Sequence, residues 1–143
     1  MSSVHGSRSY EEMIERLRDA EVLFSALFEL TYRCNLDCYF CYNDLDRRGR
    51  GMRTDDWRRA LDQLRALGAL EIGLSGGEPM VHSGFFDIAR HATSIGLVVR
   101  VKTNGHLLDA ARIERLLTEV RPFLLEIRLH GARAASHERR QHS

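Results

Sequence analysis

The sequence predicts an α/β fold in which about four parallel strands form part of a (β/α) barrel of the TIM type. Strand-like apolar segments recur at intervals of about 27 residues, and segments with helical periodicity separate them. Parallel strands need such helical crossovers. Each expected strand ends in a small or polar turn, so we expect functional residues at the carboxyl ends of the strands.

The first two expected elements lead into the barrel. Residues 9–21 carry a helical pattern with Met13, Ile14 and Leu17 on one stripe, and we take residues 1–21 as an N-terminal helix or leader. Residues 22–31 are mostly apolar and include aromatic side chains, which is typical of a buried strand. The barrel core is therefore expected over residues 22–131.

Three further units follow along the chain. Apolar residues recur at helical spacing in three segments, and the residues expected to cap them are Thr54 or Asp55, then Ser83, then Asp109. A glycine or a proline ends each of these helices, at Gly68, Gly96 and Pro122. The remaining strands are expected at residues 70–75, 97–103 and 123–129.

The last segment departs from this plan. Residues 132–143 form a polar tail without a large apolar residue, so they cannot pack as the helix that should cover the last strand. At roughly 30 residues per strand–helix unit, the chain holds only about four units. We therefore expect a chain that stops short of a full barrel.

Composition and charge exclude several classes of function. A formal net charge of +1 argues against a nucleic-acid partner. No run approaches the ~18 apolar residues that span a membrane, which argues against a membrane partner, and residues 1–18 lack the apolar core of a signal peptide. We therefore expect a cytoplasmic protein whose thiols stay reduced.

The most informative motif is a cluster of cysteines directly after the first strand. All three cysteines of the chain lie within eight residues, at Cys34, Cys38 and Cys41. Thiolates are soft ligands that suit zinc or iron–sulfur clusters. A [4Fe–4S] cluster held at three corners would keep one iron open for a small molecule. A zinc site, an electron-carrier module and three incidental cysteines are the alternatives.

A second motif follows the next strand, at residues 76–79 with the sequence Gly-Gly-Glu-Pro. Gly76 and Gly77 would let a ligand approach the backbone closely, and Glu78 offers a carboxylate to a cationic group. Alone, a Gly-Gly turn is more often structural. One unit after the cysteines, however, it would lie on the same rim of the barrel.

These motifs together resemble the signature of radical S-adenosylmethionine (radical SAM) enzymes. The likeness covers residues 27–137, and it includes Phe40 before the last cysteine and the strand ends at residues 102–105 and 129–132. The sequence Leu-Thr-Tyr-Arg-Cys-Asn at residues 30–35 is closest to the peptide- and protein-maturing, SPASM-like branch. The resemblance implies a [4Fe–4S] cluster and S-adenosylmethionine as cofactors.

The resemblance also implies roles for individual residues. Cys34, Cys38 and Cys41 would bind three irons, and the methionine group of S-adenosylmethionine would chelate the fourth. Phe40 would pack near the adenine, whereas Gly76, Gly77 and Glu78 would receive the methionine amino group. Thr103 and Asn104 either line the same pocket or form a plain strand end and Asn-Gly turn. His130 is more often structural in such a place.

The implied activity is reductive cleavage of S-adenosylmethionine to a 5′-deoxyadenosyl radical, with a peptide or protein as the candidate substrate and an external flavodoxin- or ferredoxin-like electron donor. Two features depart from the family. Arg128 stands where relatives usually have a serine, and about four strands are fewer than the six of the family core. An inactive truncated fragment, or a barrel completed by another polypeptide, is therefore the alternative.

Overall fold

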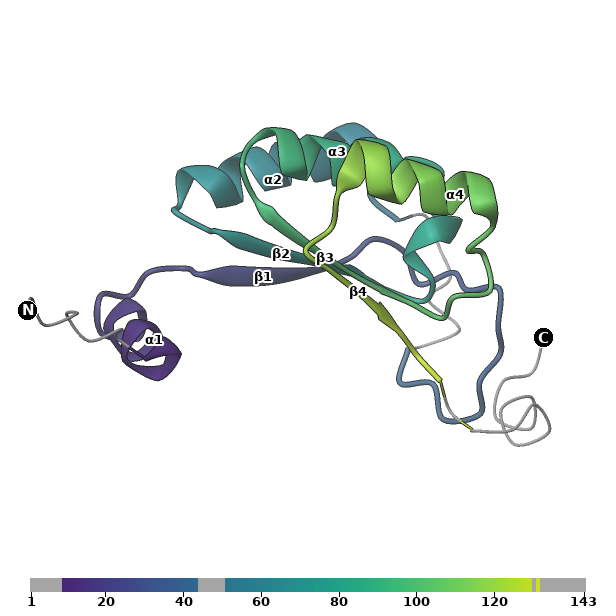
Figure 1. The fold of residues 1–143 in the computed structure, drawn as a ribbon, viewed down its shortest axis with the longest axis horizontal. Helices are drawn as coiled ribbons and strands as arrows, with labels where there is room; N and C mark the ends of the chain where they lie inside the picture. The colour runs from purple at the N-terminus through teal and green to yellow at the C-terminus, as the bar shows by residue number, and fades with distance from the viewer. Residues whose placement is uncertain (1–8, 44–50, 130, 132–143) are drawn as a thin grey trace, which may run out of the picture.

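The chain folds into one parallel sheet with helices on a single face (Figure 1). A computed structural model describes residues 9–43, 51–129 and 131. The strands are β1 (Ser25–Glu29), β2 (Glu71–Ser75), β3 (Val98–Thr103) and β4 (Leu124–Ile127), in the order β1-β2-β3-β4. All three strand pairs are parallel. This architecture confirms the predicted fold class, because the sheet holds four parallel strands in sequential order.

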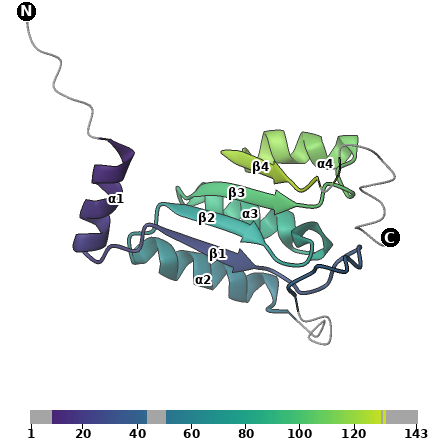
Figure 2. The same cartoon turned by 90° about the horizontal axis from the view of Figure 1, so that it is seen from below.

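The connecting helices are α2 (Thr54–Ala66), α3 (Phe85–Ser94) and α4 (Ala110–Arg115), and α4 continues as one π-helical turn, η3 (Leu116–Val120). A short 3-10 helix, η2 (Pro79–Val81), precedes α3. The helix α1 (Tyr10–Asp19) comes before β1 and lies away from the sheet in both views (Figures 1 and 2). The predicted division at residues 1–21, 22–131 and 132–143 stays a prediction, and its polar tail falls outside the described residues.

The core lies between the sheet and the helices. Alternate residues of the two central strands point toward α2 and α3 and are fully or almost fully buried, namely Ile72, Leu74, Val99 and Val101. Leu61 of α2 and Phe85, Ile88 and Ala92 of α3 complete this layer. The opposite face of the sheet carries no helix in Figure 1, and Leu27, Val98 and Leu124 are partly exposed on it.

Two of the expected helix caps are wrong and one is confirmed. The residue before α2 is Arg53, whose backbone N–H donates to Asp56 at 3.3 Å, and Gly84 rather than Ser83 precedes α3. Gly84 lies against Thr54, where a Cβ atom would meet the threonine side chain, so packing against α2 sets this start. Asp109 does cap α4, because its carboxylate accepts from the Arg112 N–H at 2.8 Å.

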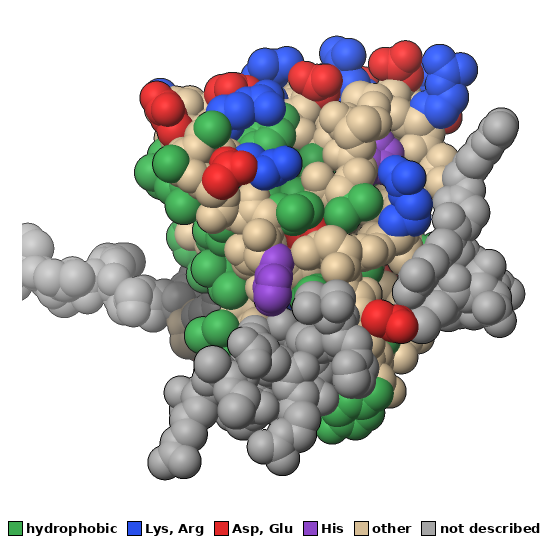
Figure 3. All heavy atoms as spheres, turned by 90° about the vertical axis from the view of Figure 1, so that its right-hand side faces the viewer, with side chains coloured by type: hydrophobic (Ala, Val, Ile, Leu, Met, Phe, Trp, Pro, Cys, Tyr) green, Lys and Arg blue, Asp and Glu red, His purple; other side chains and the backbone are tan. Residues whose placement is uncertain are grey.

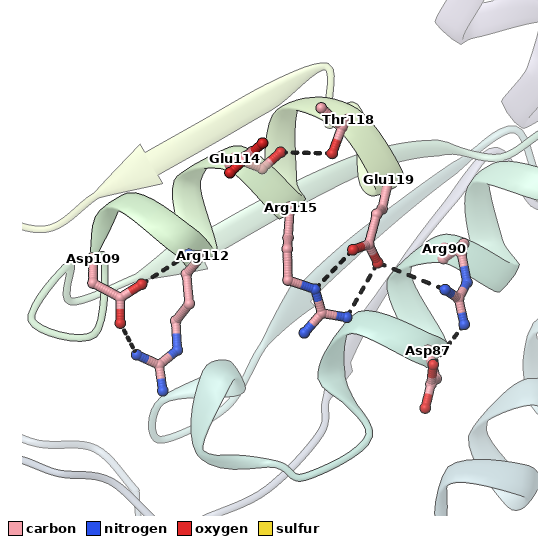
Figure 4. A network of polar contacts seen from close by, with 8 residues as sticks. All are labelled: Asp87, Arg90, Asp109, Arg112, Glu114, Arg115, Thr118 and Glu119. Atoms are coloured by element: carbon pink, nitrogen blue, oxygen red, sulfur yellow. Dashed lines mark hydrogen bonds and ion pairs between the residues drawn. The ribbon is translucent and has the colours of Figure 1, made fainter.

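Ion pairs on the outer surface connect α3 with the end of α4 (Figure 4). The Arg115 guanidinium donates to Glu119 at 2.8 and 3.1 Å, which holds the pKa of that carboxyl below its ordinary value. Arg90 lies 3.6 Å from Glu119 and 2.7 Å from Asp87. Because the arginines of these pairs are largely exposed to solvent, each pair should contribute little to the stability of the fold.

Candidate cofactor-binding site

The three cysteines lie at the carboxyl end of the sheet, which Figure 3 views from outside. They line one cavity together with residues from the ends of β2, β3 and β4. The lining residues are Cys34, Leu36, Cys38, Phe40, Cys41, Tyr42, Asn43, Ser75, Gly76, Gly77, Lys102, Thr103, Asn104 and Arg128. The structure therefore brings the predicted cysteine loop, the two glycines and the end of β3 to a single place.

The thiols lie close enough to influence one another. Burial raises the pKa of the Cys34 thiol above its ordinary value, and the carboxylate of Glu78 and the thiol of Cys41 act in the same direction. Burial also raises the pKa of Cys38, and both other cysteines add to this shift. Deprotonation of all three thiols is thus unfavourable in the protein alone. Bound cations such as iron would lower the pKa values of the thiols and favour the thiolates.

The Gly-Gly loop is joined to the cysteine loop by backbone hydrogen bonds. Beyond the β1–β2 pair, the Gly77 N–H donates to the Thr31 carbonyl at 2.7 Å and the Glu78 N–H donates to the Arg33 carbonyl at 3.0 Å. A Cβ atom at Gly76 would lie 2.4 Å from the Thr31 oxygen, and one at Gly77 would lie 2.5 Å from the Arg33 oxygen. Glycine is therefore required here so that the two loops can pack together.

The side chain of Glu78 is fully buried and connects this loop to β3. One carboxylate oxygen accepts from the Thr103 hydroxyl at 2.9 Å and from the Met80 N–H at 3.2 Å. The other accepts from the Asn104 N–H at 2.8 Å. The carboxylate lies next to the cavity, but three groups of the chain itself already satisfy it.

Asn104 and Thr103 extend this network toward the cysteines. The Thr103 hydroxyl also accepts from the Gly105 N–H at 3.0 Å. The Asn104 side-chain amide nitrogen lies 2.9 Å from Asn35 Oδ1 and 3.6 Å from Cys34 Sγ. Glu78, Thr103 and Asn104 therefore form one continuous set of contacts between the end of β3 and the cysteine loop.

Two residues near the last cysteine differ in how they face the cavity. Phe40 is 41% exposed and packs edge-to-face on Tyr39, with 5.2 Å between ring centroids. Asn43 is only 7% exposed, and its Oδ1 atom has no hydrogen-bond partner in the part of the chain that the structure describes. A buried acceptor without a partner suits a ligand with N–H or O–H donors. Sequence reasoning missed Asn43, since nothing in its type or spacing marks it.

Two cationic side chains, Lys102 and Arg128, complete the lining. Lys102 lies 3.8 Å from Glu126, whereas Arg128 lies near enough to Cys38 to lower its pKa against the stronger effect of burial. Arg128 also approaches Tyr42, whose hydroxyl donates to Glu29 at 2.9 Å. The residue that departs from the family pattern is thus part of the cavity wall. His130 lies outside the described residues.

The donor set suits an iron–sulfur cluster. A [4Fe–4S] cluster takes each thiolate on a different iron, and three thiols line one cavity here. The unpartnered Asn43 acceptor, which lines the same cavity, suits a bound small molecule beside the cluster.

Comparison with known proteins agrees with this geometry. The family model for the radical SAM superfamily matches residues 28–140. The chain belongs to the radical SAM superfamily. Membership confirms the resemblance predicted from the motifs, and with it the [4Fe–4S] cluster and S-adenosylmethionine as the cofactors of the family.

Curated relatives include PqqA peptide cyclases. The enzyme from Bradyrhizobium diazoefficiens is 34% identical over 110 residues, which cover 73% of this chain and 29% of the relative. The enzyme from Rhodopseudomonas palustris is 39% identical over 94 residues, or 64% of this chain and 25% of the relative. The chain thus spans less than a third of the length of these relatives.

Solved structures share the fold. SuiB from Streptococcus suis, bound to its precursor peptide SuiA, gives a TM-score of 0.74 at 17% identity and covers 92% of this chain and 30% of that protein. SuiB bound to S-adenosylmethionine gives the same TM-score. BtrN in complex with AdoMet and 2-DOIA gives a TM-score of 0.66 at 21% identity and covers 82% of this chain and 49% of that protein. Within the described residues, no helix has the length and apolar character to cross a bilayer.

Proposed function

We propose that Cys34, Cys38 and Cys41 hold the [4Fe–4S] cluster and that S-adenosylmethionine binds beside Gly76 and Gly77, as part of a peptide-modifying enzyme. The observation that carries this proposal is the shared cavity of the three thiols and the Gly-Gly loop. When bound, these cofactors would supply the chemistry of the reaction, which is the reductive cleavage of S-adenosylmethionine to give a 5′-deoxyadenosyl radical. The chain supplies the thiolates, the loop and the walls of the cavity.

The residues that line or support the cavity each have a task in this proposal. Gly76 and Gly77 keep backbone groups beside the cavity, and Glu78 and Thr103 hold the adjoining loops in register. Phe40 offers an apolar surface to the adenine, and Asn43 offers a buried acceptor. Asn104 lies between the cysteine loop and β3. Arg128 and Lys102 place positive charge on the wall, which suits the carboxylate of the ligand.

A peptide is the substrate class that we favour. Support comes from the name of the curated relatives, PqqA peptide cyclase, and from the precursor peptide bound to SuiB. An external electron donor, flavodoxin- or ferredoxin-like, would reduce the cluster, and a polypeptide beyond these residues would complete the barrel. We place this activity in the cytoplasm, where thiols stay reduced.

Anaerobic reconstitution with iron and sulfide tests the proposal. We expect about four irons and four labile sulfides per chain, as the cluster type requires, and an EPR signal of the reduced cluster that changes when S-adenosylmethionine is added. A Cys38→Ser variant should lose most of the iron, whereas Ser94→Ala, at the carboxyl end of α3 and outside the cavity lining, should not.

Two outcomes would contradict the proposal. An EPR signal that does not change when S-adenosylmethionine is added would refute the proposed ligand site. One zinc per chain without labile sulfide would refute the cluster and favour a zinc module.

A further inference from the structure

The side chain of Asn104 is held in one orientation by the chain itself. Its Oδ1 atom accepts from the His106 backbone N–H at 3.0 Å, which identifies the other end of the amide as the donor. Its own backbone N–H is bound to the buried Glu78 carboxylate at 2.8 Å. Both the backbone and the amide plane of Asn104 are therefore fixed.

This orientation aims the amide N–H groups at the cysteine loop. Nδ2 lies 2.9 Å from Asn35 Oδ1 and 3.6 Å from Cys34 Sγ, which is within hydrogen-bond distance for sulfur. The Leu36 backbone N–H donates to the same sulfur at 3.4 Å. Cys34 thus receives a second N–H from Asn104, which directly follows β3 and is 70 residues away in the chain.

We propose that Asn104 is a positioning residue, which orients Cys34 and donates an N–H to its sulfur, and thereby raises the reduction potential of the cluster. The inference rests on the proposed function, because it needs a cluster on Cys34. Hydrogen bonds to ligand sulfurs withdraw electron density and stabilise the reduced state. Asn104 thus lines the cavity and, in addition, acts on the cluster through its hydrogen bond to Cys34.

The competing interpretation is that Asn104 only forms the turn with His106. Two substitutions separate these roles. Asn104→Asp keeps the Oδ1 acceptor for the His106 N–H but replaces the donor with an oxygen. Asn104→Ala removes both the acceptor and the donor and adds no charge. A pure turn role predicts that Asn104→Ala, which is neutral, keeps the wild-type potential, and that any shift in Asn104→Asp comes from its charge alone.

The experiment is a redox titration of the reconstituted chain, followed by EPR, with iron content and thermal unfolding measured on each variant. We expect both variants to retain the cluster at a more negative potential, with the larger shift in Asn104→Asp because the new carboxylate also repels the added electron. A variant that binds less iron than the wild type at an unchanged thermal transition also supports the positioning of Cys34.

Asn104→Asp at the wild-type potential would overturn the inference, since neither the lost N–H nor the added charge could then reach the sulfur. If Asn104→Ala unfolds the chain, Asn104→Ser decides in its place, because its hydroxyl can accept from the His106 N–H, carries no charge and is too short to reach the Cys34 sulfur. A wild-type potential in Asn104→Ser would refute the hydrogen bond. If Asn104→Ala folds and keeps the wild-type potential while Asn104→Asp shifts, charge alone acts and the hydrogen bond is refuted. Wild-type chain that assembles no cluster would refute the proposed function itself, which is a separate result.

Discussion

At the scale of single residues, Gly76 and Gly77 let two loops pack together, because a Cβ atom at either position would clash with the backbone of Thr31 or Arg33. Glu78 was expected to face a cationic ligand, and its carboxylate accepts three hydrogen bonds from the chain. Such partners depend on loop geometry, which periodicity and spacing do not describe.

The close contact at Gly76 leads to a prediction about stability. Gly76→Ala should destabilise the fold by about 2–4 kcal/mol, because a clash with backbone adds to the strain of a positive φ. Its φ is 134°, and the new Cβ would lie 2.4 Å from the Thr31 oxygen. Urea unfolding with the change in midpoint measures this cost.

Gly68→Ala is the matched control for Gly76→Ala. Gly68 also has a positive φ, of 93°, but nothing lies within 4 Å of a Cβ atom there. Its cost should be only about 1 kcal/mol, which is the strain of the backbone alone. Equal costs at the two positions would show that the packing of the two loops contributes nothing.

Among the secondary-structure elements, the order of strands and helices was predictable and their ends were less so. Apolar periodicity located every strand and the helices α2, α3 and α4, since burial on one face is what this pattern records. It did not predict η2, nor that the predicted helix up to Pro122 ends in the π-helical turn η3, where the Arg121 N–H donates to the Leu116 carbonyl at 2.7 Å. Such terminal turns depend on packing against neighbours, here on Thr93, whose hydroxyl donates to the Val120 carbonyl.

Two helix caps should differ in their effect on the whole fold. Asp109→Ala should lower the free energy of unfolding by about 1 kcal/mol, because Asp109 caps α4, which continues into the buried residues of η3. Ser9→Ala removes a cap of the same kind, since the Ser9 hydroxyl accepts from the Glu12 N–H at 3.2 Å. Because α1 lies away from the sheet, this variant should lose helical circular dichroism with little change in the unfolding midpoint.

A clear loss of global stability in Ser9→Ala would contradict this assignment. It would mean that α1 packs on the core more closely than its position in Figures 1 and 2 indicates.

For the molecule as a whole, the sheet has a graded stability that follows from its topology. The central strands β2 and β3 each have two neighbours, whereas β1 and β4 pair on one side only within the described residues. The sequence predicted four parallel strands because each unit repeats the same plan. The predicted (β/α) barrel also implies that the connecting helices lie on one face of the sheet, as Figure 1 shows, because a barrel carries its helices outside the strands.

Hydrogen–deuterium exchange should follow this order. The amides of β2 and β3 around Leu74 and Val101, which are fully buried, should exchange most slowly, and those of β1 and β4 faster. The helix α1 should exchange fastest of the described helices, because it lacks a buried face against the sheet. Protection of α1 comparable with that of β3 would contradict this gradient.

The hydrogen bonds between the Gly-Gly loop and the cysteine loop use main-chain atoms only. Exchanging the side chains of Tyr32 or Arg33 would therefore leave the spacing between the two loops intact. The same arrangement has one vulnerable point. Proline in place of Gly77 would delete the N–H that holds Thr31, and no compensating side chain could restore it.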